Sequence, residues 1–544
     1  MLRISDKFKS VLERLFALDL RSLAFLRIGL ALYLLWDLWD RGRSLEAHYS
    51  DVGVYPVAFL QQEQYSQGYW WEQWNIHWPN YWSFHSFPGD TGAWVGFVFA
   101  LNALFLIGML VGYKTRFMVL VCWILNLSLQ NRNMMVLHGG DLMVRMLLFW
   151  CQFLPLGARW SLDGSCAIRR AYGASVPKAV LSVGTFGLIW QVCLVYFFTA
   201  LLKTGDDWLK DGTALYYALN IDLYGTWTGR ILRQSPGLCW LLTRASLFWE
   251  AVGPLFLFVP LPRVRIATVL MFLAFHLLGI GLFMDVGPLS WCSVLLWIGL
   301  LPGEFWDGLS ARWSKVRERP LPARLTAHYN TLVEWRNRRV RARVAARKPL
   351  PNIAPWLPTQ FIAAFFVWFV TAWNIGTLPN KNPANYVPSQ VRWLNAFIRL
   401  DQKWAMFAPF PSHDDGWFAM PAVWQNGKTM DLYTRLPVAW DKPDHVNRMF
   451  PDERWRKYLM NLWIKDYRYQ WQNFGEWACR SSQLHDSKGN QLRSLVVWYM
   501  LEMTVPPGQK QTPPVKTFLW EHYCSPGDAP ERIKRLNGIT ASNR

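Results

Sequence analysis

Charged residues are scarce in this chain, and acidic residues are scarcer than basic ones. Asp, Glu, Lys and Arg make up 17% of the 544 residues, whereas soluble domains carry roughly 25%. This shortage, together with 52% hydrophobic residues, argues against an ordinary soluble protein and indicates a membrane protein. The mean hydropathy is only +0.06, so a sizeable soluble part has to accompany the apolar segments.

Several chemical motifs are missing as well. The chain has no phosphate-binding loop, no GxGxxG and no GxSxG element, so no nucleotide site or serine hydrolase is indicated. No histidine has a second ligand at HxxxH or CxxC spacing, and no metal site is predicted. Aromatic residues are plentiful, with 35 tryptophans, which fits interfacial belts or a large amphipathic cavity.

Apolar windows near the roughly 20 residues that cross a bilayer predict eight to ten membrane spans. The windows lie at about 20–38, 91–112, 116–130, 141–156, 179–202, 237–260, 264–284, 288–304 and 358–376. Basic residues precede the first window and follow each even-numbered one. The positive-inside rule then places the N-terminus in the cytoplasm and the chain after the last span outside.

The spans divide the chain into four predicted parts. Residues 1–310 form a transmembrane domain, and 311–350 form a strongly basic loop, which we interpret as cytoplasmic and not as a nucleic-acid-binding segment. Residues 351–376 contain the last span, and 377–544 form an extracytoplasmic α+β domain. The predicted fold class is therefore a polytopic α-helical membrane bundle with a C-terminal extracytoplasmic α+β domain.

Strand and helix patterns support the α+β prediction. The apolar alternation on both sides of Asn426 and Gly427 predicts a β-hairpin. Residues 452–471 have helical spacing, and 494–505 and 516–524 have strand character.

Two of the eight cysteines, Cys479 and Cys524, lie in this outer part of the chain. An oxidising compartment would let them form a disulfide, and a free buried pair is the alternative.

Ionisable groups inside apolar spans are costly, so each requires a structural or functional reason. These groups are Arg27, Asp37, Asp141, Arg145, Lys203, Glu250, His276 and Asp285. Arg27 with Glu250, or Asp141 with Arg145 at helical i,i+4 spacing, are candidate structural ion pairs.

Lys203 ends the apolar stretch 180–202 and is followed by Asp206 and Asp207. Burial beside apolar walls disfavours the charged form of a lysine and makes its amine available as a base. The two aspartates would oppose this effect if they faced the amine. The alternative is that Lys203 extends to the lipid headgroups.

Four segments, taken in order, resemble the HTTM (horizontally transferred transmembrane) family, which includes the vitamin K-dependent γ-glutamyl carboxylases. FLRIGLALYLLWDLWDRG, 25–42, is similar to the first span of that family, and FLPLGARWSLDG, 153–164, to its Trp-Ser-x-Asp-Gly segment. YFFTALLKTGDDWLKDG, 196–212, resembles the catalytic-lysine segment, and AFHLLGIGLF, 274–283, the Phe-His segment. WAMFAPFP, 404–411, resembles bacterial members of the family.

The resemblance implies a membrane enzyme in which the lysine deprotonates a reduced lipid quinone such as vitamin K hydroquinone. Gly140 stands where the carboxylase has a histidine, and Gly279 where an asparagine is expected, so quinol chemistry is implied more strongly than carboxylation of glutamate. The implied catalytic residues are Lys203, His138 and His276, and the implied cofactor-binding residues are Arg27, Asp141, Glu250 and Trp208.

We therefore expect a multi-pass protein of a bacterial inner membrane that uses Lys203 as a base on a lipid-soluble quinol or a similar substrate. The main alternative is a non-catalytic maturation factor or scaffold that binds a secreted partner through residues 377–544. A transporter is a weaker alternative, because no inverted repeat is found.

Overall fold

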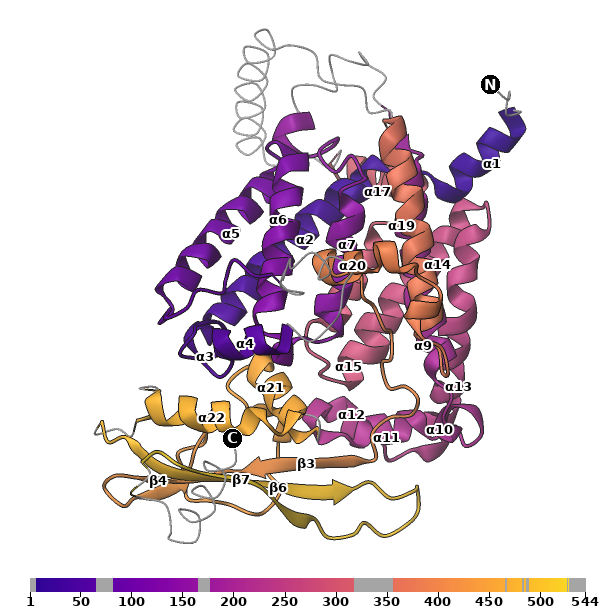
Figure 1. Ribbon diagram of the computed structural model, residues 1–544. Coiled ribbons are helices and arrows are strands. Elements are labelled where there is room, and N and C mark those ends of the chain that lie inside the picture. The colour runs from indigo at the N-terminus through magenta and orange to yellow at the C-terminus, as the bar shows by residue number, and fades with distance from the viewer. Residues whose placement is uncertain are drawn as a thin grey trace.

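The computed structural model describes residues 6–64, 82–164, 177–317, 356–464, 467–481, 484–485, 489–525 and 527. Residues 318–350 of the predicted basic loop lie outside these ranges. A helical bundle occupies the N-terminal part of the chain, and a mixed α/β region covers the end of the bundle opposite the N-terminal helix α1 (Figure 1). The predicted fold class, a membrane bundle followed by an α+β region, is confirmed.

The bundle is built from long helices joined by short helical segments. The long helices are α1 (Asp6–Phe16), α2 (Leu20–Gly42), α5 (Ala93–Val111), α6 (Thr115–Arg132), α7 (Gly139–Cys151), α9 (Val183–Leu202), α13 (Pro236–Val252), α14 (Pro262–Ala274), α16 (Leu289–Ile298), α17 (Gly303–Arg317) and α19 (Leu357–Gly376). The short ones are α3 (Leu45–Tyr49), α4 (Val57–Gln64), α10 (Asp206–Leu209), α11 (Ala214–Asn220), α12 (Trp227–Leu232) and α15 (Gly281–Phe283). Helix α20 (Ser389–Ile398) follows α19 in the chain. A two-stranded pairing of β1 (Leu18–Asp19) with β2 (Ala179–Val180) joins the beginnings of α2 and α9.

Six helical segments among the described residues are long and apolar enough to cross a membrane. They are Leu20–Gly42, Ala93–Val111, Val183–Leu202, Pro236–Phe258, Pro262–Phe283 and Leu357–Gly376. A bent pair of helices makes a seventh if it is counted as one span. The eight to ten windows thus exceed the spans that the structure supports, because α7 has only 13 residues and α6 ends in a polar Gln-Asn-Arg sequence. Both helices are nevertheless part of the bundle.

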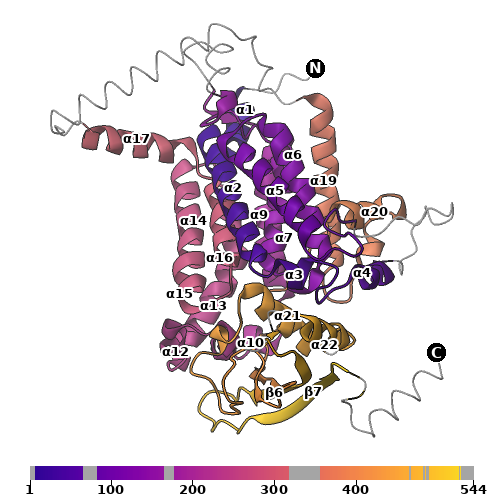
Figure 2. The same ribbon diagram turned by 90° about the vertical axis from the view of Figure 1, so that its left-hand side faces the viewer.

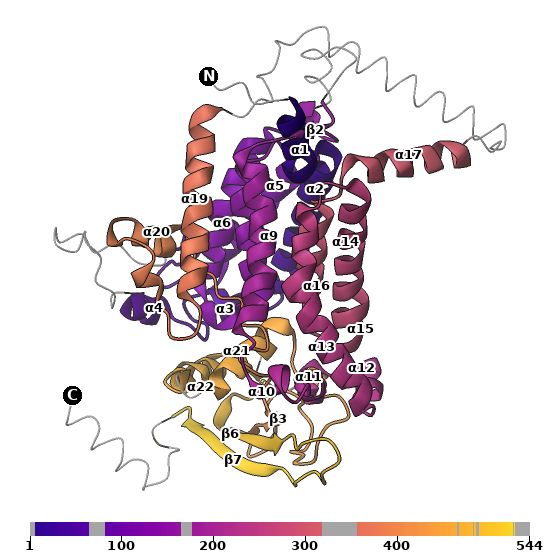
Figure 3. The same ribbon diagram turned by 90° about the vertical axis from the view of Figure 1, so that its right-hand side faces the viewer.

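The bent pair consists of α16 and α17, whose axes differ by 91° across the break 299–302. Figures 2 and 3 show α17 leaving the bundle sideways, at the end where the N-terminus lies. The polar sequence of α17 and its exposed Trp313 suit the membrane surface better than the hydrocarbon core. The predicted span 288–304 therefore ends earlier than the apolar window suggested.

The α/β region contains one five-stranded antiparallel sheet and two amphipathic helices. Its strands are β3 (Asp414–Ala419), β4 (Pro421–Trp424), β5 (Thr429–Asp431), β6 (Leu492–Met503) and β7 (Val515–Tyr523). Strand β6 pairs with β3 and β4 along one edge and with β7 along the other. The helices α21 (Glu453–Trp463) and α22 (Gln470–Arg480) lie between this sheet and the bundle (Figures 1 and 3).

Two specific predictions for this region are confirmed. Strands β4 and β5 form the hairpin, and Gly427 in its turn has a φ of 79°, which glycine adopts without strain. Cys479 and Cys524 form a disulfide that ties the end of α22 to the end of β7. The disulfide is consistent with an extracytoplasmic location of this region.

Candidate functional site

An apolar cavity of about 530 Å³ lies between α9, α13 and the α14–α15 segment, at the end of the bundle that faces the α/β region. Lys203, Trp208, Glu250 and His276 all line it. Four of the seven residues that the sequence implied for a site are thus brought together. The volume is within the range of roughly 300–1,000 Å³ that is usual for small-molecule pockets.

Lys203 is the residue at which α9 ends, and its side chain turns inward. It is only 4% exposed, and its Nζ donates a hydrogen bond to Glu250 Oε2 on α13. The same nitrogen lies 4.1 Å from the centre of the Trp208 ring. The inward alternative for Lys203 is therefore what the structure shows, with a carboxylate partner and an aromatic face beside the amine.

The turn after Lys203 is held against the segment that leads into the α/β region. The Gly205 backbone N–H donates to the carbonyl of Pro409 at 2.9 Å, and a Cβ on Gly205 would lie 2.8 Å from that oxygen. The Trp208 indole N–H donates to the carbonyl of Phe407 at 2.9 Å. These contacts with Phe407 and Pro409 therefore fix the directions in which the Lys203 and Trp208 side chains point.

The two aspartates after Lys203 have other partners. Asp206 pairs with Lys210 at 3.0 Å, and Asp207 pairs with His413 at 2.7 Å. Glu250 is the acid that partners Lys203, and the predicted pairing of Glu250 with Arg27 is wrong. Spacing in the sequence pointed to neighbouring acids, whereas a carboxylate from another helix makes the contact.

His276 lies in a π-helical turn, Phe275–Ile280, which widens the helix at the cavity. Its Nε2 is 2.6 Å from the hydroxyl of Tyr196, and the indole N–H of Trp297 donates to the same hydroxyl at 2.6 Å. Because Trp297 can only donate, the Tyr196 proton is satisfied by pointing to His276 Nε2. This arrangement assigns the histidine proton to Nδ1, which is buried and has no hydrogen-bond partner among the described residues.

One wall of the cavity faces away from the core of the bundle. Phe248 on α13 and Met271 on α14 line the cavity and are 63% and 53% exposed. Only 28% of the α13 span window and 22% of the α14 span window are buried. This wall consists of apolar side chains on spans that face lipid, so a ligand dissolved in the bilayer would meet it directly.

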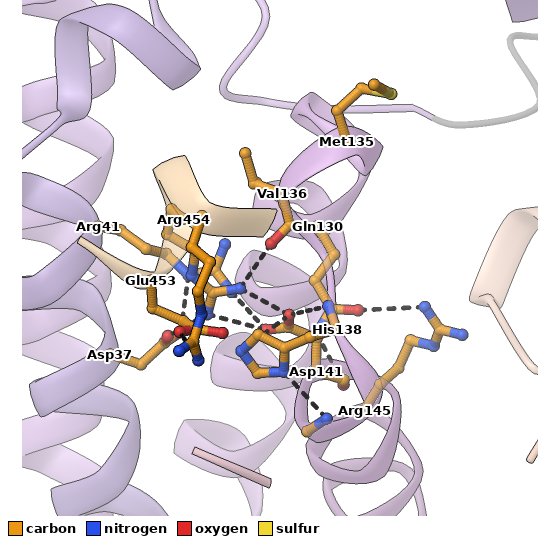
Figure 4. Close-up of polar contacts among 12 residues, drawn as sticks. Asp37, Arg41, Gln130, Met135, Val136, His138, Asp141, Arg145, Glu453 and Arg454 are labelled. Carbon is orange, nitrogen blue, oxygen red and sulfur yellow. Dashed lines mark hydrogen bonds and ion pairs between the residues drawn. The ribbon is translucent and has the colours of Figure 1, made fainter. Parts of the chain in front are cut away.

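Asp141 and His138 belong to a second, separate polar cluster (Figure 4). Asp141 binds Arg41 Nη2 at 2.5 Å and Arg454 Nη1 at 2.7 Å. Asp37 binds the same two arginines at 2.8 and 2.5 Å. Two acids and two arginines therefore neutralise one another inside the bundle, and Arg454 is supplied by α21 of the α/β region.

The remaining predicted residues have structural roles in this geometry. His138 begins α7, where its Nδ1 accepts the Gly140 N–H at 3.0 Å. Arg27 donates to the carbonyl of Trp160 at 2.5 Å and holds the segment after α7. Neither side chain lines the cavity of Lys203, and Asp141 does not either. Asp141, the predicted partner of Arg145 on α7, instead binds Arg41 of α2 and Arg454 of α21.

One cluster of three acidic residues, where the segment between α11 and α12 meets strands β3 and β6, has a geometry that could hold a metal ion. Carboxylate oxygens of Asp222, Asp415 and Glu502 lie within 4.8 Å of one another. Lys442 Nζ binds Asp222 at 2.6 Å and also contacts Glu502. The ammonium group of Lys442 therefore provides the positive charge at this acidic cluster.

Three residues of the His276 and Asp141 clusters, Tyr196, Trp297 and Arg454, could not be singled out from sequence patterns. The first two are aromatic residues in apolar spans, where packing is the usual role. Arg454 lies in the predicted helical segment 452–471, and nothing in its sequence links that segment to the bundle. Comparison of the chain with protein-family models, with curated proteins and with solved structures finds no match. The fold and the contacts establish a multi-span membrane protein.

Proposed function

We propose that the protein is an integral membrane enzyme in which Lys203 acts as a base on a lipid-soluble quinol or a similar substrate. The supporting observation is the meeting of Lys203, Glu250 and His276 in one apolar cavity beside the lipid-facing surface. The resemblance of residues 196–212 and 274–283 to the HTTM family motivates the choice of a quinol. Carboxylation of protein glutamate is not part of the proposal.

The pair of Lys203 and Glu250 can accept a proton without leaving a new isolated charge in the cavity. The Lys203 ammonium passes one proton to the Glu250 carboxylate, and its amine takes one from the substrate hydroxyl. After the transfer the ammonium faces the deprotonated oxygen, and Glu250 is neutral. Apolar surroundings strengthen that attraction because little water screens it.

His276 can donate a hydrogen bond to the polar group at the other end of such a substrate. Its unpartnered Nδ1–H is a donor in the wall of an otherwise apolar cavity, and an aromatic ligand with oxygens on two sides would present an acceptor to it. A reduced lipid quinone would supply the acidic hydroxyl that Lys203 deprotonates. Trp208 and Trp249 offer flat faces for its ring.

The location of the site agrees with the charge-derived topology. Most of the residues that line the cavity belong to the end of α9, to α10–α15 and to the segment around Phe407. Figure 1 shows that this end of the bundle carries the α/β region and lies opposite α1. We infer that α1 is cytoplasmic and that the α/β region is extracytoplasmic, in a bacterial inner membrane. The disulfide and the basic residues near the first span support this orientation.

The test uses Lys203→Arg in protein reconstituted in nanodiscs. Arginine keeps the ion pair with Glu250 but does not act as a base, because its guanidinium stays protonated. With dissolved dioxygen as the two-electron acceptor, we expect the oxidation of added naphthohydroquinone to naphthoquinone, followed by absorbance, to fall to background in this variant. Quenching of tryptophan fluorescence should still report binding of the naphthoquinone. Lys210→Arg, on an exposed side chain, is the matched control and should keep full activity.

A scaffold that binds a secreted partner is the second candidate. It is favoured by strand β7, which pairs with β6 on one side and exposes Val515 and Phe518. If Lys203→Arg retained oxidation, or if no naphthoquinone bound to the wild-type protein, the enzyme proposal would fail and the scaffold would be preferred.

A further inference from the structure

A second groove, separate from the cavity of Lys203, lies where the membrane helices meet the α/β region. It has a volume of about 570 Å³. Trp227 and Trp291 form its apolar side and are 75% and 61% exposed. Exposed tryptophans at the end of membrane spans are typical of the headgroup layer of a bilayer. The groove therefore opens at the depth of the lipid headgroups.

The opposite side of the groove is polar and comes from the α/β region. His445, Asn447 and Arg448 line it, and they are held in place by Val446, which is 1% exposed and packs in the core beneath. An adjoining hollow of about 510 Å³ shares Asn447, Arg448 and Trp291 and continues toward the end of α2. The two hollows form one groove with an apolar and a polar wall.

The charges along this groove are unequally matched. Asp285 and Glu453 both pair with Arg456, and Asp40 pairs with Arg43 at 3.1 Å. Among the residues that the structure describes, no carboxylate lies within ion-pair distance of Arg448. Arg448 is therefore a guanidinium of this groove without an ion-pair partner in the described part of the chain, and the carboxylate of Asp452 in the same lining accepts hydrogen bonds from Ser44 Oγ and the Trp455 backbone N–H.

Two buried polar atoms in the lining of the first hollow also have no hydrogen-bond partner among the described residues. They are Oγ of Ser290, whose side chain is 5% exposed, and Oδ1 of Asn447. Buried polar atoms are nearly always satisfied by protein, water or a ligand. Together with Arg448, they make a set of polar groups that a ligand with several oxygens and a hydroxyl would satisfy.

We propose that this groove binds the phosphate-bearing headgroup of a membrane phospholipid. Arg448 binds the phosphate, Ser290 Oγ donates to an ester oxygen, and Asn447 Oδ1 accepts a hydrogen bond from an alcohol hydroxyl of the headgroup. The acyl chains follow the exposed apolar surface beside Trp291. Met284 and Val286 line both this groove and the cavity of Lys203, so the bound lipid borders the lateral wall of that cavity. The proposal does not depend on the chemistry assigned to Lys203.

Native mass spectrometry of the full-length protein in detergent tests this proposal. The probes are phosphatidylglycerol, diacylglycerol with the same chains, and glycerol phosphate. We expect retention of phosphatidylglycerol in preference to diacylglycerol, and a loss of affinity of roughly fivefold or more in Arg448→Gln. Lys428→Gln, which removes the same charge from the exposed β4–β5 turn, should bind as the wild type does.

Ser290→Ala gives a second variant that should fold normally, because its Oγ has no partner to lose. We expect an unchanged melting temperature and a reduction in phosphatidylglycerol affinity of roughly threefold. Equal binding by wild type, Arg448→Gln and Ser290→Ala would overturn the proposal and leave a water-filled groove. Displacement of the lipid by glycerol phosphate at equal concentration would show a soluble phosphate site instead.

Discussion

The amine of Lys203 and the carboxylate of Glu250 meet across 47 residues of sequence, in the wall of a cavity whose other residues are mostly apolar. Both side chains are buried, at 4% and 7% exposure. Because little water reaches this position, each of the two charges is stable only when the other is present to neutralise it. The ion pair therefore has a structural consequence that is independent of any reaction.

Removing one member of this pair should be more harmful than removing both. Lys203→Met leaves Glu250 buried and unpaired, and we expect a loss of about 3–5 kcal/mol in the free energy of unfolding. The double variant Lys203→Met/Glu250→Leu should recover most of that loss. Unfolding by sodium dodecyl sulfate in mixed micelles measures both values. Additive losses in the double variant would contradict the ion pair.

Tyr196→Phe should disturb both neighbours of the hydroxyl. The indole N–H of Trp297 loses its acceptor, and Nε2 of His276 loses its donor. We expect a loss of stability of about 2–3 kcal/mol and a weaker affinity for a naphthoquinone, measured by fluorescence quenching. Tyr113→Phe removes a hydroxyl from a side chain that is 47% exposed and should change neither property.

Arg454→Met should loosen the α/β region from the bundle. Asp37 and Asp141 would then share only Arg41, and one negative charge would remain buried without a partner. We expect a cost of about 3–5 kcal/mol and faster hydrogen exchange in α21. Lys428→Met, at the exposed turn, is the control. Unchanged protection of α21 amides would show that the four-residue cluster does not hold the two parts together.

The stability of the α/β region should depend on pH through Asp415. Burial, opposed in part by a hydrogen bond from the Asp222 backbone, raises the pKa of Asp415 from 3.8 to about 7. Between pH 4 and 7 the folded state holds a proton that the unfolded chain has released, so stability falls as the pH rises through this range.

Asp415→Asn resembles the protonated carboxyl group. We expect it to raise the melting temperature at pH 8, to leave it nearly unchanged at pH 4, and to flatten the pH profile. Burial also raises the pKa of Glu453 to about 7, so part of the decrease in melting temperature with rising pH should remain in this variant. A variant with the same profile as the wild type would show that Asp415 carries no excess proton.

Reduction of the disulfide should destabilise the α/β region without affecting the spans. Cys479 and Cys524 are separated by 45 residues, and closing a loop of this length stabilises a fold by about 4 kcal/mol in the chain-entropy model. Cys479→Ser/Cys524→Ser should increase proteolysis of this region. Cys239→Ser, which changes a free thiol in α13, is the comparison for general effects of removing cysteine.

Local patterns in the sequence predicted most of the elements. The windows 20–38, 91–112 and 179–202 correspond to α2, α5 and α9, because long apolar runs have few alternatives in a bilayer. The segments 494–505 and 516–524 correspond to β6 and β7. The segment 452–471 has helical spacing, and the structure places two helices over it, α21, which ends at Trp463, and α22, which begins at Gln470.

Contacts between distant segments were beyond this kind of prediction. Helical spacing indicates that Asp141 and Arg145 share one side of α7, but it does not indicate which element packs on that side. Arg454, which lies 313 residues away from Asp141 in the sequence, provides the contact. Lys203 could be placed at the end of its span, whereas its direction depends on Glu250 and on the segment around Pro409.

The position of Arg454 also has a consequence for biosynthesis. Until residue 454 has been translated and has folded against the bundle, Asp37 and Asp141 share a single arginine between them. The nascent membrane helices therefore carry an excess acid in an apolar environment, and they reach electrical balance only when the last domain is in place. Assembly of the bundle is completed from its C-terminal end, so chains truncated before α21 should be recognised as unfinished and degraded by membrane proteases.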